Sequence, residues 1–261
     1  MSRLAIHAAR LLPVALGIGA LAFGPCADAS ASSASPPAGL DAQAAPSIVP
    51  LSYGRISRWA YPNVTAVARA TPSPQARAVG RLSFFSPDGL DQAQIYQELR
   101  EERVPATGVM WVDVSLLHRP NGSTGWVRAS ALGPVHTSYG MIVVDRARLR
   151  LTLYNRNGKA IFSAPVGIGR PSLPTPPGHF YVAEKFVDPI DGGVYGPFLL
   201  GTSAFAPTLS DWPGGGIIGI HGTDQPQLIP GRPSHGCIRL VNSAITRLWP
   251  LVTLGTRIDI T

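Results

Sequence analysis

The sequence has little cysteine and no long hydrophobic run. Of its 261 residues only two are cysteines, Cys26 and Cys237, which excludes a small scaffold built on disulfides. The longest apolar run, residues 11–24, has 14 residues, whereas a helix needs about 20 to cross a bilayer. No later run approaches that length, so the rest of the chain is not expected to enter a membrane.

Acidic residues are also in the minority. The 15 Asp and Glu residues face 22 Lys and Arg residues, which gives a formal net charge of +7. A basic protein of this kind is expected to associate with an anionic surface such as a cell envelope, and salt weakens that attraction. Nucleic acid is not an expected partner, because no basic cluster with interleaved aromatic residues occurs.

Residues 1–29 are typical of a secretory signal peptide. Arg3 and Arg10 supply the positive charge, and the apolar run is followed by a small-residue cleavage pattern. Cleavage there would remove Cys26 and leave Cys237 as the remaining cysteine. The sequence therefore predicts an exported protein, on the cell-wall or periplasmic side of the envelope, that meets the membrane only through this segment. Cleavage and retention as an anchor both stay open.

The chain after the signal peptide divides into a tether and a small domain. Residues 30–58 are rich in Ala, Ser and Pro, which predicts a flexible tether. Residues 59–135 are predicted to form a small β-barrel, because short strand-like runs alternate with turn clusters. These runs cover residues 64–68, 79–84, 110–116 and 125–127. Residues 91–103 fit either a helix face or a strand alternation, and we predict a strand.

Residues 138–261 have the length of one domain and are predicted to be mainly β. Strands are expected at residues 141–145, 150–154, 180–186 and 217–221. Asn157-Gly158 predicts a hairpin turn, and Asn242 is the predicted N-cap of a helix over 243–249. Residues 188–213 lack a regular pattern and are predicted to form an irregular lid. Because the domain boundary lies in a linker, a chain starting near Val135 is expected to fold by itself.

The most informative stretch is Ser234-His235-Gly236-Cys237-Ile238-Arg239-Leu240, whose cysteine lies sixteen positions after the histidine of His221-Gly222-Thr223. A thiol nucleophile needs an imidazole that takes its proton, and the imidazole needs an acceptor that fixes its tautomer. An acyl-transfer intermediate also needs backbone N–H donors for its oxyanion, and a glycine lets the backbone approach closely. The two short segments supply residues of these types.

Other interpretations stay open at this point. Cys237 alone is compatible with a small buried hydrophobic residue, and His221, His235 and Cys237 together could hold zinc. The two-residue spacing of His235 and Cys237 does not favour a metal, and no further cysteine supports one, so no metal site is predicted. Arg239 is either a surface cation or an anchor for a substrate carboxylate.

These motifs resemble the signature of the bacterial L,D-transpeptidase catalytic domain. The resemblance runs from about Ser138 to Thr261 and includes Thr-Pro-Pro-Gly at 175–178, Val-Tyr-Gly-Pro at 194–197 and the closing segment 255–260. It implies Cys237 as nucleophile and His221 as general base. It also implies supporting roles for neighbouring groups: a hydroxyl donor from Tyr195, the carbonyl of Gly222 orienting the base, loop shaping by Ser234 and His235, and an oxyanion hole from the amides of Gly236 and Cys237.

Residues 59–135 resemble bacterial Src-homology-3-like domains, which accompany wall enzymes. The two resemblances together imply a mainly β protein: a Src-homology-3-like barrel, then an L,D-transpeptidase-type β-sandwich with one short helix and the lid. They imply a cofactor-free, exported peptidoglycan transpeptidase that cross-links stem peptides through a Cys237 thioester. An L,D-carboxypeptidase on the same site and a non-catalytic wall-binding protein are the alternatives. The acceptor amine, the stem diamino acid, the barrel's ligand and the oligomeric state stay open.

Overall fold

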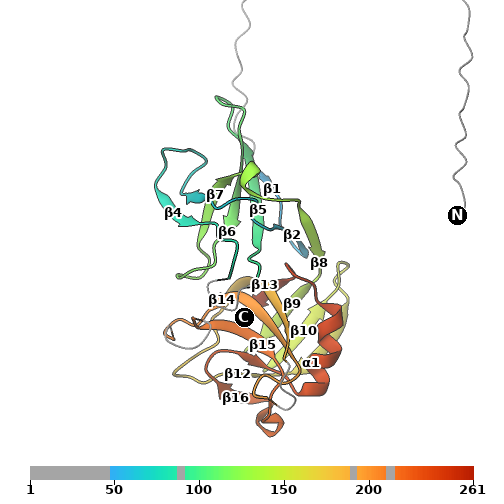
Figure 1. Cartoon of the computed structure of the whole chain (residues 1–261). Helices are drawn as coiled ribbons and strands as arrows, with labels where there is room; N and C mark the ends of the chain where they lie inside the picture. Colours follow the sequence, from blue (N-terminus) through green and yellow to red (C-terminus); the bar gives the residue numbers. More distant parts are fainter. Residues whose placement is uncertain (1–47, 87–91, 189–192, 210–214) are drawn as a thin grey trace, which may run out of the picture. The chain divides into compact units, whose positions relative to one another are not determined.

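A computed structural model of the chain describes residues 48–86, 92–188, 193–209 and 215–261. These belong to one compact unit, Gln43–Thr261, which is mainly β (Figure 1). Within the described ranges, no helix has the length and apolar character needed to cross a bilayer. The predicted signal peptide and residues 30–47 of the predicted tether lie outside the described residues.

The N-terminal strands form a sheet with the path β4-β3-β7-β6-β5-β2-β8, and β1 also pairs with β5. Its members are β1 (Ile48–Pro50), β2 (Ile56–Ala60), β3 (Val67–Arg69), β4 (Ala78–Arg81), β5 (Tyr96–Arg103), β6 (Met110–Ser115), β7 (Thr124–Arg128) and β8 (His136–Tyr139), with the 3₁₀ turn η1 (Ala129–Ala131) after β7. Apolar side chains such as Ala68, Leu82 and Val114 are fully buried between the strands. The sheet therefore has its own core.

Several expectations from the sequence can be compared with this sheet. The strand predicted within 91–103 is confirmed as β5. The tether predicted for 30–58 is wrong at its C-terminal end, because β1 and the first residues of β2 pair with neighbouring strands. Ser138, predicted to open the second domain, lies in β8, which pairs with β2 of the N-terminal sheet.

The C-terminal sheet has ten strands in the order β11-β10-β9-β18-β13-β14-β15-β17-β12-β16. They are β9 (Met141–Asp145), β10 (Arg150–Tyr154), β11 (Ala160–Pro165), β12 (Gly167–Gly169), β13 (Gly178–Val187), β14 (Phe198–Phe205), β15 (Ile217–His221), β16 (Gly231–Ser234), β17 (Ile238–Arg239) and β18 (Arg257–Ile260). The long strand β13 joins two halves, since residues 178–181 pair with β18 and residues 182–187 pair with β14. Buried side chains from both halves, among them Ile142, Leu151, Leu200 and Ile220, share one hydrophobic core.

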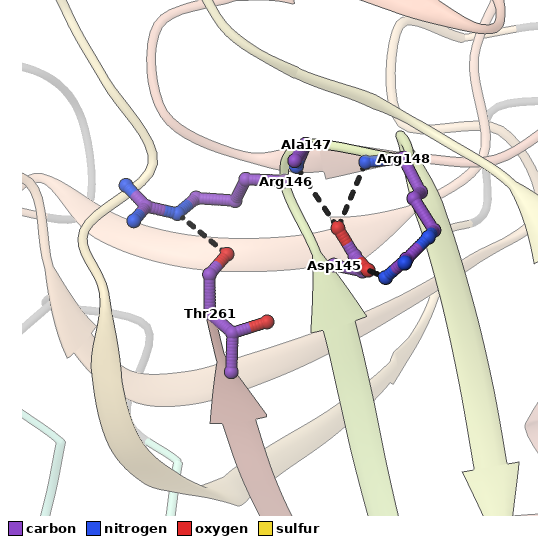
Figure 2. Close-up of polar contacts among 5 residues, drawn as sticks. All are labelled: Asp145, Arg146, Ala147, Arg148 and Thr261. Atoms are coloured by element: carbon purple, nitrogen blue, oxygen red, sulfur yellow. Dashed lines mark hydrogen bonds and ion pairs between the residues drawn. The ribbon is translucent and has the colours of Figure 1, made fainter.

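The turn between β9 and β10 is closed by a carboxylate (Figure 2). Asp145 accepts hydrogen bonds from the backbone N–H groups of Ala147 (3.0 Å) and Arg148 (2.8 Å) and pairs with the Arg148 guanidinium at 2.7 Å. Arg146, on the same turn, donates through Nε to the Thr261 carbonyl at 2.9 Å. The turn thereby fixes the last residue of the described chain beside β9 (Figure 2).

Two further expectations need correction. The segment 188–213, predicted to be irregular, contains the eight-residue strand β14, whose buried residues Leu200 and Ala204 belong to the core. The single α-helix of the described residues, α1 (Asn242–Leu248), begins at Asn242 instead of being capped by it, and continues into η3 (Trp249–Leu251). The Asn242 side chain is engaged elsewhere, because its Oδ1 accepts the Thr223 N–H at 2.8 Å.

The two sheets share a third hydrophobic cluster. Trp59 and Ile95 from the N-terminal sheet region pack with Tyr181 and Ala183 of β13. The Tyr181 hydroxyl donates to the Ile95 carbonyl at 3.1 Å, and Tyr181 is fully buried. A Cβ on Gly255 would lie only 2.0 Å from the Trp59 ring, so the glycine lets the two regions meet. These contacts argue against the expectation that a chain starting near Val135 folds by itself.

Candidate active site

Strand register brings the two sequence motifs together. β15 and β17 are parallel neighbours, with Ile220 opposite Ile238 and His221 opposite Arg239. Side chains alternate between the two faces of a strand, so His221 and Arg239 share one face while Ile220 and Ile238 point into the core. Cys237 directly precedes β17 and is two positions from Arg239, which places it on the same face as His221.

The Cys237 thiol is partly buried and meets a backbone donor. The Gly219 N–H donates to Cys237 Sγ at 3.4 Å. Burial raises the pKa of the Cys237 thiol, and the Gly219 N–H and the nearby Arg239 cation both act to lower that pKa. The resting thiol therefore keeps its proton, while the two groups beside it favour the thiolate once a base removes that proton.

His221 is buried in a fixed orientation. Its side chain is 2% exposed, and its Nδ1 donates to the Gly222 carbonyl at 2.6 Å, which leaves Nε2 as the acceptor nitrogen. Burial lowers the pKa of His221 to about 4; the hydrogen bond to Gly222 acts against this shift and Arg239 adds to it. The imidazole is thus neutral near pH 7, as a proton acceptor must be.

The Tyr195 ring packs against the His221 imidazole in a T-shaped arrangement. The two rings are 5.0 Å apart at an interplanar angle of 80°. The turn that carries Tyr195 can approach because Gly196 and Gly222 lack side chains: a Cβ on Gly196, where φ is +61°, would lie 2.7 Å from the Gly222 Cα. The same Cβ would lie 2.3 Å from Asn242 Oδ1, so α1 completes this packing.

The loop before Cys237 is held by the Ser234 hydroxyl, which changes one expectation. Ser234 Oγ donates to the Cys237 carbonyl at 2.6 Å and accepts the Gly236 N–H at 3.1 Å. The Gly236 N–H, predicted to help form an oxyanion hole, is therefore already bonded to Ser234 in this conformation. Gly236 itself adopts φ +128°, and a Cβ there would lie 2.7 Å from Ile218 Cδ1.

A second hydroxyl, that of Thr175, also binds this loop. Thr175, 1% exposed, donates through Oγ1 to the Gly236 carbonyl at 2.6 Å and accepts the Gly169 N–H at 2.9 Å. Its own carbonyl accepts from Arg146 Nη1 at 3.2 Å. The β9–β10 turn, the Thr175 segment and the Cys237 loop are therefore joined by consecutive hydrogen bonds.

Arg239 and His235 complete the neighbourhood. Arg239 Nε is buried and has no hydrogen-bond partner among the described residues. His235 is half-buried. Its pKa is lowered mainly by burial, and also by the Arg170 and Arg239 cations. Across the described part of the chain, no three His, Cys, Asp or Glu side chains lie close enough together to hold a metal ion. The arrangement suits acyl transfer by a thiol, with a neutral imidazole as proton acceptor and a cation nearby.

Comparison with known proteins agrees with this chemistry. Residues 140–260 match the family model described as YkuD, L,D-transpeptidase catalytic domain. The likeness is therefore between this stretch and the L,D-transpeptidase catalytic domain, and it covers less than half of the chain. The remaining residues of the described chain fall outside that match.

Relatives of this stretch are found in several bacteria. YkuD of Bacillus subtilis (strain 168), whose name assigns it to the L,D-transpeptidases, is 32% identical over 119 residues, covering 46% of this chain and 64% of that protein. ErfK/SrfK of Escherichia coli (strain K12), named in the same way, is 32% identical over 133 residues, covering 46% of this chain and 43% of that protein. The chain thus spans less than two thirds of the length of either relative.

A solved structure matches a similar share of the chain. The catalytic domain of the Enterococcus faecium L,D-transpeptidase is 25% identical, and the match covers 47% of this chain and 96% of that one, with a TM-score of 0.36.

Three residues that contribute to the candidate site were not predicted from the sequence as functional positions. Gly219 supplies the N–H at the thiol, Thr175 holds the Gly236 carbonyl, and Asn242 holds the Thr223 amide. Thr175 was visible as the first residue of the Thr-Pro-Pro-Gly motif, but nothing in the motif says which carbonyl its hydroxyl reaches. Gly219 contributes through its backbone, for which a sequence gives no signal.

Proposed function

We propose that this protein is an exported L,D-transpeptidase that cross-links peptidoglycan through a thioester on Cys237. The substrate is a tetrapeptide stem, and the bond broken is the L,D-peptide bond after its third residue. The stem is held on Cys237 while D-alanine leaves, and an amine of a neighbouring stem then takes the acyl group. The observation that carries this proposal is that the parallel strands β15 and β17 bring together His221 and Cys237, the residue directly before β17, with His221 oriented by Gly222.

Proton transfer in this proposal runs between the thiol and the imidazole. Sγ attacks the scissile carbonyl while His221 Nε2 takes the thiol proton, and the imidazolium then protonates the departing amine. The ion pair formed on transfer offsets the burial that opposes each charge alone. In the second step His221 takes a proton from the acceptor amine and returns it to Sγ as the thioester is cleaved.

The oxyanion and the stem carboxylate need separate donors. Because the Gly236 amide is bonded to Ser234, we assign the oxyanion to the Cys237 N–H and the Tyr195 hydroxyl. We assign the substrate carboxylate to Arg239, whose buried Nε lacks a partner among the described residues. His235 and Ser234 shape the loop, and no step requires a cofactor.

The remainder of the protein would place this site at the cell wall. We propose that residues 1–29 direct export, that the N-terminal sheet is a Src-homology-3-like module that binds or positions wall peptides, and that the basic charge favours the anionic envelope. Organisation of the wall and of cell shape would follow from cross-linking. A wall-binding protein without catalysis would keep these features and lack turnover.

Intact-protein mass spectrometry tests the proposal directly. After incubation with a disaccharide tetrapeptide, the wild type is expected to gain the mass of the substrate minus D-alanine, which is the thioester adduct. Cys237→Ala is the matched control, since the change in volume is small, and should gain nothing. Product formation by Cys237→Ala would exclude Cys237 as the nucleophile.

The same reaction separates the two enzymatic outcomes. A second stem that offers a free amine should yield a cross-linked dimer if the site is a transpeptidase. Release of tripeptide alone, with the amine in excess, would make the protein an L,D-carboxypeptidase, because water would then be the acceptor.

A further inference from the structure

Two side chains of the loop between β6 and β7, those of Arg119 and Asn121, bind the C-terminal sheet. Arg119 donates to the carbonyls of Ala206 (3.2 Å), Leu209 (2.7 Å) and Gly215 (2.9 Å). Its guanidinium also lies 5.0 Å from the centre of the Phe205 ring. One cation therefore binds three backbone carbonyls and one aromatic face, all at the end of β14 or in its connection to β15.

Asn121, two residues further along the loop, binds the same place in a second way. Its Nδ2 donates to the Phe205 carbonyl at 2.8 Å, and its Oδ1 accepts the Phe205 N–H at 2.9 Å. The amide side chain thus replaces a neighbouring strand at the end of β14. These five hydrogen bonds join segments more than 80 positions apart in the chain.

The residues that Arg119 and Asn121 bind lie close to the Cys237 loop. Phe205 pairs with Ile217 at the start of β15, and the Ala206 N–H donates to the Gly216 carbonyl at 2.8 Å. A Cβ placed on Gly236 would lie 2.7 Å from Ile218 Cδ1 and 3.9 Å from the Ala206 Cβ, which shows how closely these residues meet the loop. The start of β15 therefore pairs with the segment that Arg119 and Asn121 bind, and both lie close to the Cys237 loop.

β15 also carries two groups of the proposed site. Gly219 presents its N–H to Cys237 Sγ, and His221 follows two positions later on the same face. We propose that Arg119 and Asn121 are positioning residues, which hold the end of β14 and the start of β15 so that Gly219 and His221 face Cys237. This inference rests on the proposed function of Cys237, and it gives the N-terminal sheet a part in the reaction besides any wall binding.

The proposal has a specific chemical consequence. A small shift of β15 would lengthen the weak Gly219 N–H to Sγ contact, and loss of that donor would raise the pKa of the thiol. A misplacement of about 1 Å at a reacting group can slow a reaction about a hundredfold. A contact that only stabilises the fold would lower the melting temperature without changing the titration of Cys237.

The experiment compares Arg119→Gln and Asn121→Ala with Arg128→Gln in the full chain. Arg128 is a matched control, because it also stacks over an aromatic ring, that of Trp111, which lies within its own N-terminal sheet. Two rates are measured for each protein: alkylation of Cys237 by iodoacetamide as a function of pH, and formation of the thioester adduct with the disaccharide tetrapeptide. Alkylation is followed on the peptide that contains Cys237, because the full chain also contains Cys26. Circular dichroism establishes that each protein is folded at the assay temperature.

Arg119→Gln and Asn121→Ala should both move the alkylation profile to higher pH and slow adduct formation by about tenfold or more. Arg128→Gln should match the wild type in both assays. Asn121→Ala leaves the arginine in place, so it tests the same proposal if Arg119→Gln does not fold. Wild-type profiles and adduct rates in the folded variants would overturn the inference, even with lowered melting temperatures. If the wild type alkylates normally but never forms an adduct, the proposed function fails, while the alkylation profiles still decide the positioning role.

Discussion

The titration of His221 should appear in the stability of the protein. Burial lowers the pKa of His221 to about 4 in the folded state, against 6.5 for an ordinary histidine. Between these two values the unfolded chain binds a proton at this position and the folded chain does not. Stability therefore rises with pH across this interval, and the contribution is lost as the pH falls from 6.5 toward 4.

The size of the effect follows from the pKa difference. Each pH unit inside the interval changes the free energy of unfolding by about 1.4 kcal/mol per proton, so the whole interval is worth about 3 kcal/mol. Glu98 acts in the opposite direction, because burial raises its pKa to about 7 from 4.5 and its stability contribution is lost as the pH rises. The wild type should consequently show a flatter pH dependence than either group alone would produce.

Two substitutions separate the opposing groups. Urea unfolding at several pH values between 4 and 7.5 should show that the stability gap between the wild type and His221→Gln widens by about 3 kcal/mol as the pH rises. Glu98→Gln is the matched control, and its gap to the wild type should change with the opposite sign. A gap for His221→Gln that is constant over this range would show that the imidazole is not desolvated as the structure indicates.

Three further expectations concern single contacts. Thr175→Val removes the hydroxyl bonded to Gly236, so it should lower the free energy of unfolding in urea by about 1–3 kcal/mol and slow adduct formation. Thr175→Ser should keep the wild-type stability and adduct rate. Equal behaviour of the two variants would refute the role of the hydroxyl. Tyr195→Phe keeps the ring beside His221 and removes the hydroxyl. If the Tyr195 hydroxyl binds the oxyanion, the rate of adduct formation should fall about tenfold or more while the alkylation profile of Cys237 stays unchanged. A wild-type adduct rate would refute this role. A chain starting near Val135 should melt at a much lower temperature than the full chain, because it exposes Tyr181. Tyr181→Phe in the full chain loses only the hydrogen bond to Ile95 and should lower the free energy of unfolding by about 1 kcal/mol. Equal melting temperatures of the truncated and full chains would show that the shared cluster stabilises neither sheet.

Local patterns predicted much of the secondary structure. The strands expected at residues 141–145 and 150–154 are confirmed as β9 and β10, and the Asn157-Gly158 turn leads into β11 with Gly158 at φ +81°. Such signals depend on near neighbours in the chain, which a sequence displays. β14 was missed because both its faces are largely covered, so its residues show no alternation of polar and apolar side chains.

The candidate site divides along the same line. His221 and Cys237 were visible because their side chains carry the chemistry. The hydrogen bonds of the Gly236 amide and the Thr175 hydroxyl depend on which atoms meet after folding. The hydrogen bonds of Arg119 depend on how the two sheets pack. Asn242 shows the limit most clearly: its side chain suits a helix cap, but in the folded chain it binds the Thr223 N–H instead.

The parallel register of β15 and β17 means that the distance along the chain between base and nucleophile carries no chemical meaning. The strands, through Ile220 and Ile238, set where His221 and Cys237 lie, while the exposed stretch around η2 (Pro226–Leu228) only has to connect them. Doubling the length of a flexible connection costs about 0.6 kcal/mol. Extra residues inserted near Gln227 should therefore leave the site intact, and proteins with the same site can be expected to differ widely in this spacing.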